Sequence, residues 1–233
     1  MDMLPVLLAA GAAGAAAATF AWGATSASAQ LFGRTIRRTG DSSTMALTFD
    51  DGPNPAATPQ LLELLDRHEA HATFFLIGKH VRAFPSLAKE IVERGHTVGN
   101  HTETHPKLTF LSTHSIDQEL DHCDAAIEAA TGRIPRWMRP PFGFRGPQLD
   151  AVVRRHGGSG VVMWSAMAGD WKPQPAARVI ERLRRAGGSD IVLLHDADHR
   201  ALEGDRGHTL TAVEYWLPRW QDRGIRFVNL DEF

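Results

Sequence analysis

The sequence is poor in cysteine and in net charge, and each shortage excludes a class of protein. Cys123 is the only cysteine among 233 residues, which rules out an intrachain disulfide and a zinc site built from several cysteines. The formal net charge is −2 at pH 7, so the composition gives no electrostatic case for binding nucleic acid or another anionic polymer. We find no internal repeat and, beyond the first 30 residues, no low-complexity stretch.

The remaining composition is that of a globular α/β domain. Hydrophobic residues make up 43% and charged residues 22% of the chain, and strand-like and helix-like runs alternate from residue 44 onward. The expected strands are 44–50, 72–77, 96–100, 136–139, 160–165, 190–195 and 225–230, and the expected helices are 58–69, 84–94, 115–131, 147–156, 175–186 and 208–222. Alternation over about seven strands predicts a single domain over residues 44–233, built as a parallel (β/α) barrel. We expect residues 31–43 to form a linker.

The first 30 residues form an apolar segment that has two interpretations. Residues 3–24 are uncharged and rich in Ala and Gly, and residues 26–30 resemble a small-residue cleavage site. A secretory signal peptide cleaved after Ala29 is one interpretation, although no Lys or Arg precedes the apolar run. A membrane anchor is the other, because about 20 apolar residues can span a bilayer. We expect a protein of the cell envelope, anchored or secreted, and favour membrane association. The arginines after the segment would place the domain in the cytoplasm, so the membrane side stays open.

Two adjacent carboxylates end the first strong strand pattern. Residues 48–53 read Thr-Phe-Asp-Asp-Gly-Pro, which puts Asp50 and Asp51 at the end of an apolar run that a turn then stops. Neighbouring acids repel each other and lose solvation, so such a pair indicates a cation or a proton-transfer task. The simpler alternative is a turn in which one Asp caps a helix.

A pair of histidines could complete a metal site with one of these acids. His101 and His105 are four residues apart, and two imidazoles with the carboxylate of Asp51 would leave a coordination position open for water. The spacing alone is weak, because the chain holds twelve histidines and has a second such pair in His195 and His199. A two-histidine, one-carboxylate site favours a divalent metal ion, above all Zn²⁺.

Further polar residues follow other expected strands. Arg139 precedes a Pro-Pro-Phe-Gly turn in which the N–H of Phe142 could face an incoming oxygen. Asp170 and His195 lie after two more apolar runs. In parallel α/β folds the loops after the strands' carboxyl ends form the active site, so we expect all of these groups to meet there.

Taken in order, these motifs resemble the polysaccharide deacetylase family, also called the NodB-homology group or carbohydrate esterase family 4. The resemblance rests on residues 48–53, 101–105, 139–143, 170–171 and 193–195, and it covers roughly residues 45–230. It implies a distorted barrel with fewer than eight strands. One position departs from the family pattern: Met167 stands where the fourth motif usually has an acid. We interpret that change as one of loop support or specificity.

The resemblance implies a metal-dependent hydrolase that removes N-acetyl groups from amino sugars. In this reading Asp51, His101 and His105 hold the metal ion, and Asp50 takes the proton of the attacking water. Arg139 would orient Asp50 and keep it ionised.

The other implied roles concern the leaving group and the acyl pocket. His195 would protonate the departing amine, and Asp170 would fix its tautomer and raise its pKa. The Phe142 N–H would stabilise the oxyanion, while Leu193 and Trp171 would line the acyl pocket.

The sequence leaves the glycan open among peptidoglycan, a chitin-like oligomer, an exopolysaccharide and a lipid-linked sugar. Three other functions remain as alternatives: a deacylase of a lipid-linked sugar or small amide, a carbohydrate-binding protein without turnover, and a structural metal domain. The charged loop at 196–208 could be a second metal site, but we favour a specificity loop near the catalytic mouth.

Overall fold

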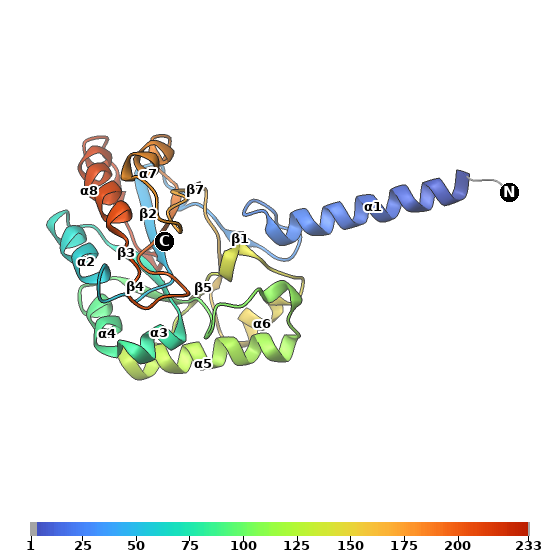
Figure 1. The fold of residues 1–233 in the computed structure, drawn as a ribbon, viewed down its shortest axis with the longest axis horizontal. Helices are drawn as coiled ribbons and strands as arrows, with labels where there is room; N and C mark the ends of the chain where they lie inside the picture. The colour runs from blue at the N-terminus through green and yellow to red at the C-terminus, as the bar shows by residue number, and fades with distance from the viewer. Residues whose placement is uncertain (1–3, 233) are drawn as a thin grey trace.

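The structure, a computed structural model, describes residues 4–232, and it describes the side chains of residues 11–232. A curled sheet of parallel strands lies at the centre, and helices cover its outer side (Figure 1). The order across the sheet is β1 (Thr35–Ile36), β6 (Gly160–Val162), β5 (Trp137–Met138), β4 (Thr97–Asn100), β3 (Ala72–Leu76), β2 (Thr44–Asp50), β8 (Ile191–His195) and β7 (Ala166–Met167). A ninth strand, β9 (Arg226–Phe227), pairs with β2.

The helices alternate with these strands, as the sequence pattern predicts. They are α1 (Leu4–Thr25), α2 (Thr58–Arg67), α3 (Gly78–Ala83), α4 (Pro85–Glu93), α5 (Thr113–Thr131), α6 (Leu149–Arg155), α7 (Ala176–Leu183) and α8 (Gly207–Gln221). The single α/β domain and the distorted, partly open barrel are thereby confirmed. All seven expected strands are present, with ends that differ by up to three residues.

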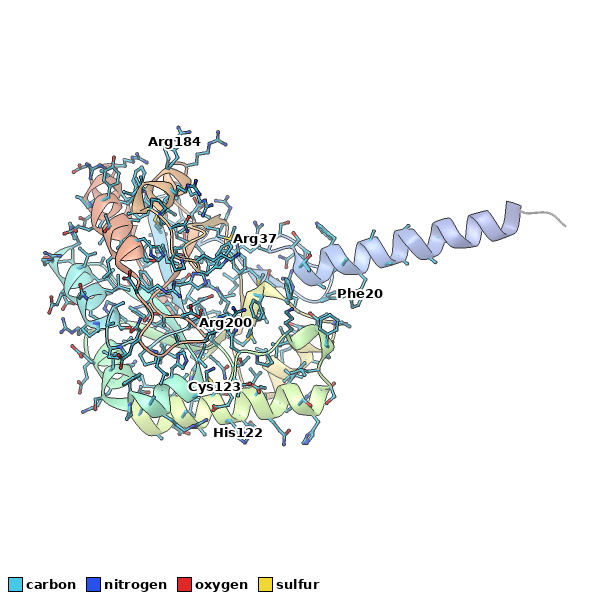
Figure 2. The ribbon with its side chains drawn as sticks, in the orientation of Figure 1. Phe20, Arg37, His122, Cys123, Arg184 and Arg200 are labelled. Carbon is cyan, nitrogen blue, oxygen red and sulfur yellow. The ribbon has the colours of Figure 1, made fainter. Side chains whose placement is uncertain are left out.

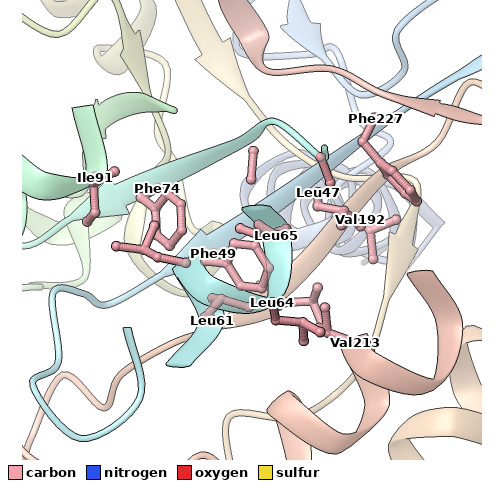
Figure 3. Packing of buried hydrophobic residues seen from close by; sticks show 14 of the residues in the cluster. Leu47, Phe49, Leu61, Leu64, Leu65, Phe74, Ile91, Val192, Val213 and Phe227 are labelled. Atoms are coloured by element: carbon pink, nitrogen blue, oxygen red, sulfur yellow. The ribbon is translucent and has the colours of Figure 1, made fainter. Parts of the chain in front are cut away.

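The largest hydrophobic cluster fills the space between the central strands and the outer helices. Phe49 of β2 and Phe74 of β3 stack with ring centroids 5.1 Å apart, and Leu61 and Leu65 of α2 pack on them (Figure 3). Burying one such side chain contributes roughly 1.5–3 kcal/mol, so this layer fixes the strands whose ends carry the polar residues. Cys123 of α5 is buried, as a small core residue.

Two strands and one helix were not expected. β1 lies within the stretch expected as a linker and pairs in parallel with β6, while β7 pairs with β8. Each of the two strands has only two residues, too few to produce an alternating pattern. The short helix α3 follows β3 after a single residue and has no side-chain cap.

The amino-terminal helix α1 extends away from the domain (Figure 1), but the turn after it packs on the domain. The backbone N–H of Arg145 donates to the carbonyl of Ala24, and its guanidinium donates to the carbonyls of Ser26 and Ala29 at 3.0 and 2.6 Å. In the part of the chain that the structure describes, no helix is both long and apolar enough to span a membrane.

Candidate active site

The carboxyl ends of the strands open into one cavity of about 280 Å³. Parallel pairing aligns Asp50 at the end of β2 with His195 at the end of β8. The residues expected to contact the substrate or the metal all line this cavity. Arg139 and Asp170 do not line it, because both are fully buried. The lining consists of Asp50, Asp51, His101, His105, Phe142, Gly143, Phe144, Trp164, Met167, Trp171, Leu193, His195 and His199.

Three of these side chains form a potential metal-binding cluster. Ligand atoms of Asp51, His101 and His105 all lie within 4.8 Å of one another. The Oδ1 atom of Asp51 faces the Nε2 atoms of His101 at 3.5 Å and of His105 at 3.3 Å. This oxygen is buried and has no hydrogen-bond partner among the described residues, a deficit that coordination to a cation would compensate. The donor set therefore fits a divalent ion such as Zn²⁺.

The protonation of these groups also suits a cation. Burial disfavours the charged carboxyl of Asp51, but the histidines around it outweigh burial and hold its pKa well below its usual range. Burial lowers the pKa of His105 to about 2, so its ring is neutral. The Nδ1–H of His101 donates to the carbonyl of Arg139 at 2.7 Å, which leaves the Nε2 lone pair of His101 for the cluster.

The backbone is held in the left-handed region at several of these positions. Asp51, His105 and Phe142 have φ angles of 75°, 63° and 60°. Such angles are uncommon for residues with a Cβ and gather where function requires them. The ring of His80, a buried residue of α3, donates from Nδ1 to the carbonyl of Asp51 at 2.7 Å and so helps to hold that turn.

Asp50 forms a buried ion pair with Arg139. A guanidinium nitrogen of Arg139 lies 2.8 Å from Oδ1 of Asp50 and 2.7 Å from the hydroxyl of Thr48. The guanidinium also lies over the ring of Phe75, 4.3 Å from its centroid, and the arginine is fully buried. The other oxygen of Asp50 faces the cluster, 3.7 Å from Nε2 of His101. Arg139 therefore orients a carboxylate whose second oxygen stays available.

His195, at the end of the neighbouring strand β8, forms a second buried pair with Asp170. Nδ1 of His195 donates to Oδ1 of Asp170 at 2.9 Å, while the backbone N–H of His195 and the hydroxyl of Thr209 each donate to Oδ2 at 2.8 Å. Burial alone lowers the pKa of His195, but the Asp170 carboxylate outweighs it and raises that pKa to about 9. The ring therefore holds its proton tightly. Because Nδ1 is bonded to Asp170, Nε2 is the nitrogen left to face the cavity.

Aromatic and apolar side chains form the rest of the wall. Phe142 and Trp171 are each 42% exposed at the cavity, while Leu193 is buried at its floor. Trp164, expected in the core, is half-buried and lines the cavity as well. Met167 is exposed beside it.

Sequence reasoning missed several residues of this site, among them His199. His199, on the loop after β8, stacks on the ring of His105 with centroids 4.2 Å apart. The loop was expected near the catalytic mouth, but no strand or helix pattern indicates which of its side chains turns inward. Spacing pairs His199 with His195, whereas the structure places it beside His105.

Comparison with known proteins agrees with this geometry. Residues 37–161, more than half of the chain, match the family described as polysaccharide deacetylase. A peptidoglycan-N-acetylglucosamine deacetylase of Listeria monocytogenes (strain 10403S) is 37% identical over 190 residues, which cover 81% of this chain. The chain spans only 38% of that relative's length. A chitooligosaccharide deacetylase of Azorhizobium caulinodans is 35% identical over 203 residues, which cover 84% of this chain and 96% of the relative.

Solved structures give the same assignment. A family 4 pseudoenzyme from Bacillus anthracis superposes with a TM-score of 0.77 at 29% identity, over 85% of this chain and 68% of that one. The ordered strand-end motifs, the curled parallel sheet and the relatives all converge, and the chain belongs to the polysaccharide deacetylase family, carbohydrate esterase family 4.

Proposed function

We propose that this chain is a metal-dependent hydrolase that removes N-acetyl groups from the amino-sugar residues of a glycan. The observation that carries the proposal is the placement of three functional groups in one cavity: the Asp51, His101 and His105 cluster, the Asp50–Arg139 pair and the His195–Asp170 pair. A cation site flanked by a proton acceptor and a proton donor is what amide hydrolysis requires.

We assign the metal to Asp51, His101 and His105 and expect Zn²⁺. Two imidazoles and one carboxylate are a zinc donor set with an open position. Bound there, the divalent ion would supply Lewis-acid chemistry, lowering the pKa of water and polarising the acyl oxygen. The neutral ring of His105 and the depressed pKa of Asp51 mean that neither side chain must release a proton first.

Asp50 acts as the general base. Its Oδ1 is held by Arg139, and its Oδ2 faces the cavity, where it accepts the proton of the attacking water as the water oxygen bonds to the acyl carbon. The fixed guanidinium prevents this carboxylate from turning away. The N–H of Phe142, on a left-handed turn at the cavity, stabilises the negative oxygen of the tetrahedral intermediate.

His195 acts as the general acid. An amine leaves only when protonated, and the proton held on the His195 ring by the Asp170 charge is available for transfer to the nitrogen as the C–N bond breaks. Leu193 and Trp171 form the apolar wall that would receive the acetyl methyl group.

For the substrate we propose an N-acetylated glycan. The two relatives named above from Listeria monocytogenes and Azorhizobium caulinodans are deacetylases of peptidoglycan and of chitooligosaccharides. Peptidoglycan, a chitin-like oligomer, an exopolysaccharide and a lipid-linked sugar can each carry the N-acetyl group. A binding protein without turnover is disfavoured, because each position proposed for catalysis carries a side chain able to perform it. We propose the cell envelope as the place of action, with the amino-terminal segment as the attachment; cell fractionation of the full chain tests this.

Acetate release by the purified protein tests the function. Zinc-reconstituted and chelator-stripped protein would be assayed on N-acetylglucosamine oligomers and peptidoglycan fragments, with Asp50→Ala as the inactive control. We expect release that requires metal and that the variant lacks. Absence of release from every substrate, with metal demonstrably bound, would refute the deacetylase assignment for these glycans and shift weight to another acyl group.

A further inference from the structure

The loop after β8 places His199 against the proposed metal cluster. The ring of His199 lies nearly parallel to that of His105, at 25°, and edge-on to that of Phe142, with centroids 5.4 Å apart. Its side chain is 25% exposed, so it forms part of the cavity wall. His199 is therefore in direct contact with the site, although its spacing in the sequence pairs it with His195 instead.

Hydrogen bonds from other elements anchor this loop. The Lys79 ammonium, at the start of α3, donates to the carbonyl of His199 at 2.9 Å. The side-chain amide of Asn54 donates to the carbonyls of Asp196 and Gly204, at 3.0 and 2.8 Å, and so ties both arms of the loop to one point. The position of His199 over the cluster is thus built into the fold.

His199 engages only one of the two oxygens of Asp51. Its backbone N–H lies 3.3 Å from Oδ2, and its Nδ1 lies 3.7 Å from the same atom. The other oxygen, Oδ1, faces His101 and His105 and has no hydrogen-bond partner among the described residues. In the Asp51 carboxylate, Oδ2 therefore accepts a hydrogen bond from His199, whereas Oδ1 has no donor and remains available to a cation.

The tautomer of His199 follows from its hydrogen bond with the Arg200 side chain. Nε of Arg200 donates to Nε2 of His199 at 3.3 Å, so Nε2 is the accepting nitrogen. In a neutral imidazole the proton then sits on Nδ1, which directs an N–H dipole at Oδ2 of Asp51. With Nε2 engaged by Arg200 and Nδ1 protonated, the His199 ring has no free lone pair for a cation. Its backbone N–H makes the hydrogen bond to Oδ2 of Asp51, and Nδ1, 3.7 Å from that oxygen, acts on it through the dipole of its N–H.

We propose that His199 is a positioning residue for the cation site. It holds Oδ2 of Asp51 so that Oδ1 alone is offered to the cation, and its ring fixes the plane of His105. Outer groups that hydrogen-bond to metal ligands orient them and tune affinity by about 10–100-fold. The inference rests on the proposed function, since it assumes that the cluster binds a divalent ion.

The test measures cation affinity and coordination in the full chain, without reference to turnover. Zn²⁺ and Co²⁺ dissociation constants come from competition with a chromophoric chelator, and the visible absorption of bound Co²⁺ reports its geometry. Variants are His199→Ala, which removes the ring and its N–H, and His199→Phe, which keeps an aromatic ring against His105 but has no ring N–H; both keep the backbone N–H that donates to Asp51. The matched control is His122→Ala, an exposed histidine on the outer side of α5 (Figure 2).

We expect both His199 variants to bind Zn²⁺ about 10–100-fold more weakly and to shift the Co²⁺ bands, while His122→Ala equals the wild type. Wild-type affinity and an unchanged Co²⁺ spectrum in His199→Ala would overturn the inference alone. Wild-type affinity in His199→Phe would overturn it too, because ring packing would then suffice. A wild-type chain that binds neither ion would overturn the proposed function together with this inference.

Discussion

Replacing Asp170 by asparagine removes the charge that controls the protonation of His195. The pKa of His195 is raised from 6.5 to about 9, a difference worth roughly 3 kcal/mol between its two protonation states. That value is net of burial, which acts in the opposite direction. The asparagine amide would offer a single acceptor oxygen, whereas the Asp170 carboxylate receives three hydrogen bonds. We therefore expect the pKa of His195 to fall below 6.5 in the variant.

The sign of the stability change follows from the direction of this shift. A histidine whose pKa is raised on folding contributes stability that is fully present below pH 6.5 and is lost as the pH rises through about 9. The metal-free wild type should therefore lose roughly 3 kcal/mol of unfolding free energy between about pH 6 and about pH 9.5, relative to Asp170→Asn.

Two assays on metal-free protein measure these effects. NMR titration of the imidazole ε1 proton, assigned with a His195→Gln variant, gives the midpoint of His195 directly. Urea unfolding at the two pH values gives the stability difference. A wild-type midpoint near the ordinary histidine value of about 6.5, or one that Asp170→Asn leaves in place, would refute the reasoning, because the carboxylate would then exert no net effect on the ring.

Three further perturbations follow from the same structure. Arg139→Met leaves Asp50 buried without its partner, so urea unfolding should show a loss of about 3–5 kcal/mol, and a loss below about 1 kcal/mol would contradict the buried pair. Zn²⁺ at about 100 times its dissociation constant should stabilise the wild type by about 2.7 kcal/mol in the same assay and should leave Asp51→Ala unchanged; equal stabilisation of both would place the ion elsewhere. A chain that begins at residue 31 lacks the carbonyls of Ser26 and Ala29, which accept hydrogen bonds from the Arg145 guanidinium. Its unfolding free energy should be about 1–3 kcal/mol lower than that of a chain beginning at residue 23; identical values would show that the turn contributes no stability.

Much of the fold and the placement of the polar residues could be predicted from sequence, for a physical reason. Strands β2 and β8 are buried along their whole length, so their sequences are largely apolar and end abruptly at Asp50, which Asp51 follows, and at His195. Parallel strands bring their carboxyl ends to one edge, which places those acids and the imidazole together without any knowledge of the loops. The metal and catalytic roles of these residues remain predictions.

The parts that sequence could not supply depend on contacts across the chain. The two-residue strands β1 and β7 exist only because neighbouring strands offer them partners. His199 reaches Asp51 because Lys79 and Asn54 anchor its loop from other elements, and Thr209 meets Asp170 only when α8 packs against the barrel. No local periodicity encodes such contacts.

A titration of metal against activity shows directly whether this chain is a metal-dependent deacetylase. Metal-free chain would receive Zn²⁺ in steps while acetate release from an N-acetylglucosamine oligomer and bound zinc are recorded together, with Asp50→Asn beside the wild type. If Asp51, His101 and His105 hold a catalytic ion and Asp50 is the general base, release rises to a plateau at one ion per chain, and Asp50→Asn binds one ion yet is slower by about 10²–10⁴-fold. Full release by the metal-free chain, or by Asp50→Asn with its ion bound, would contradict these assignments.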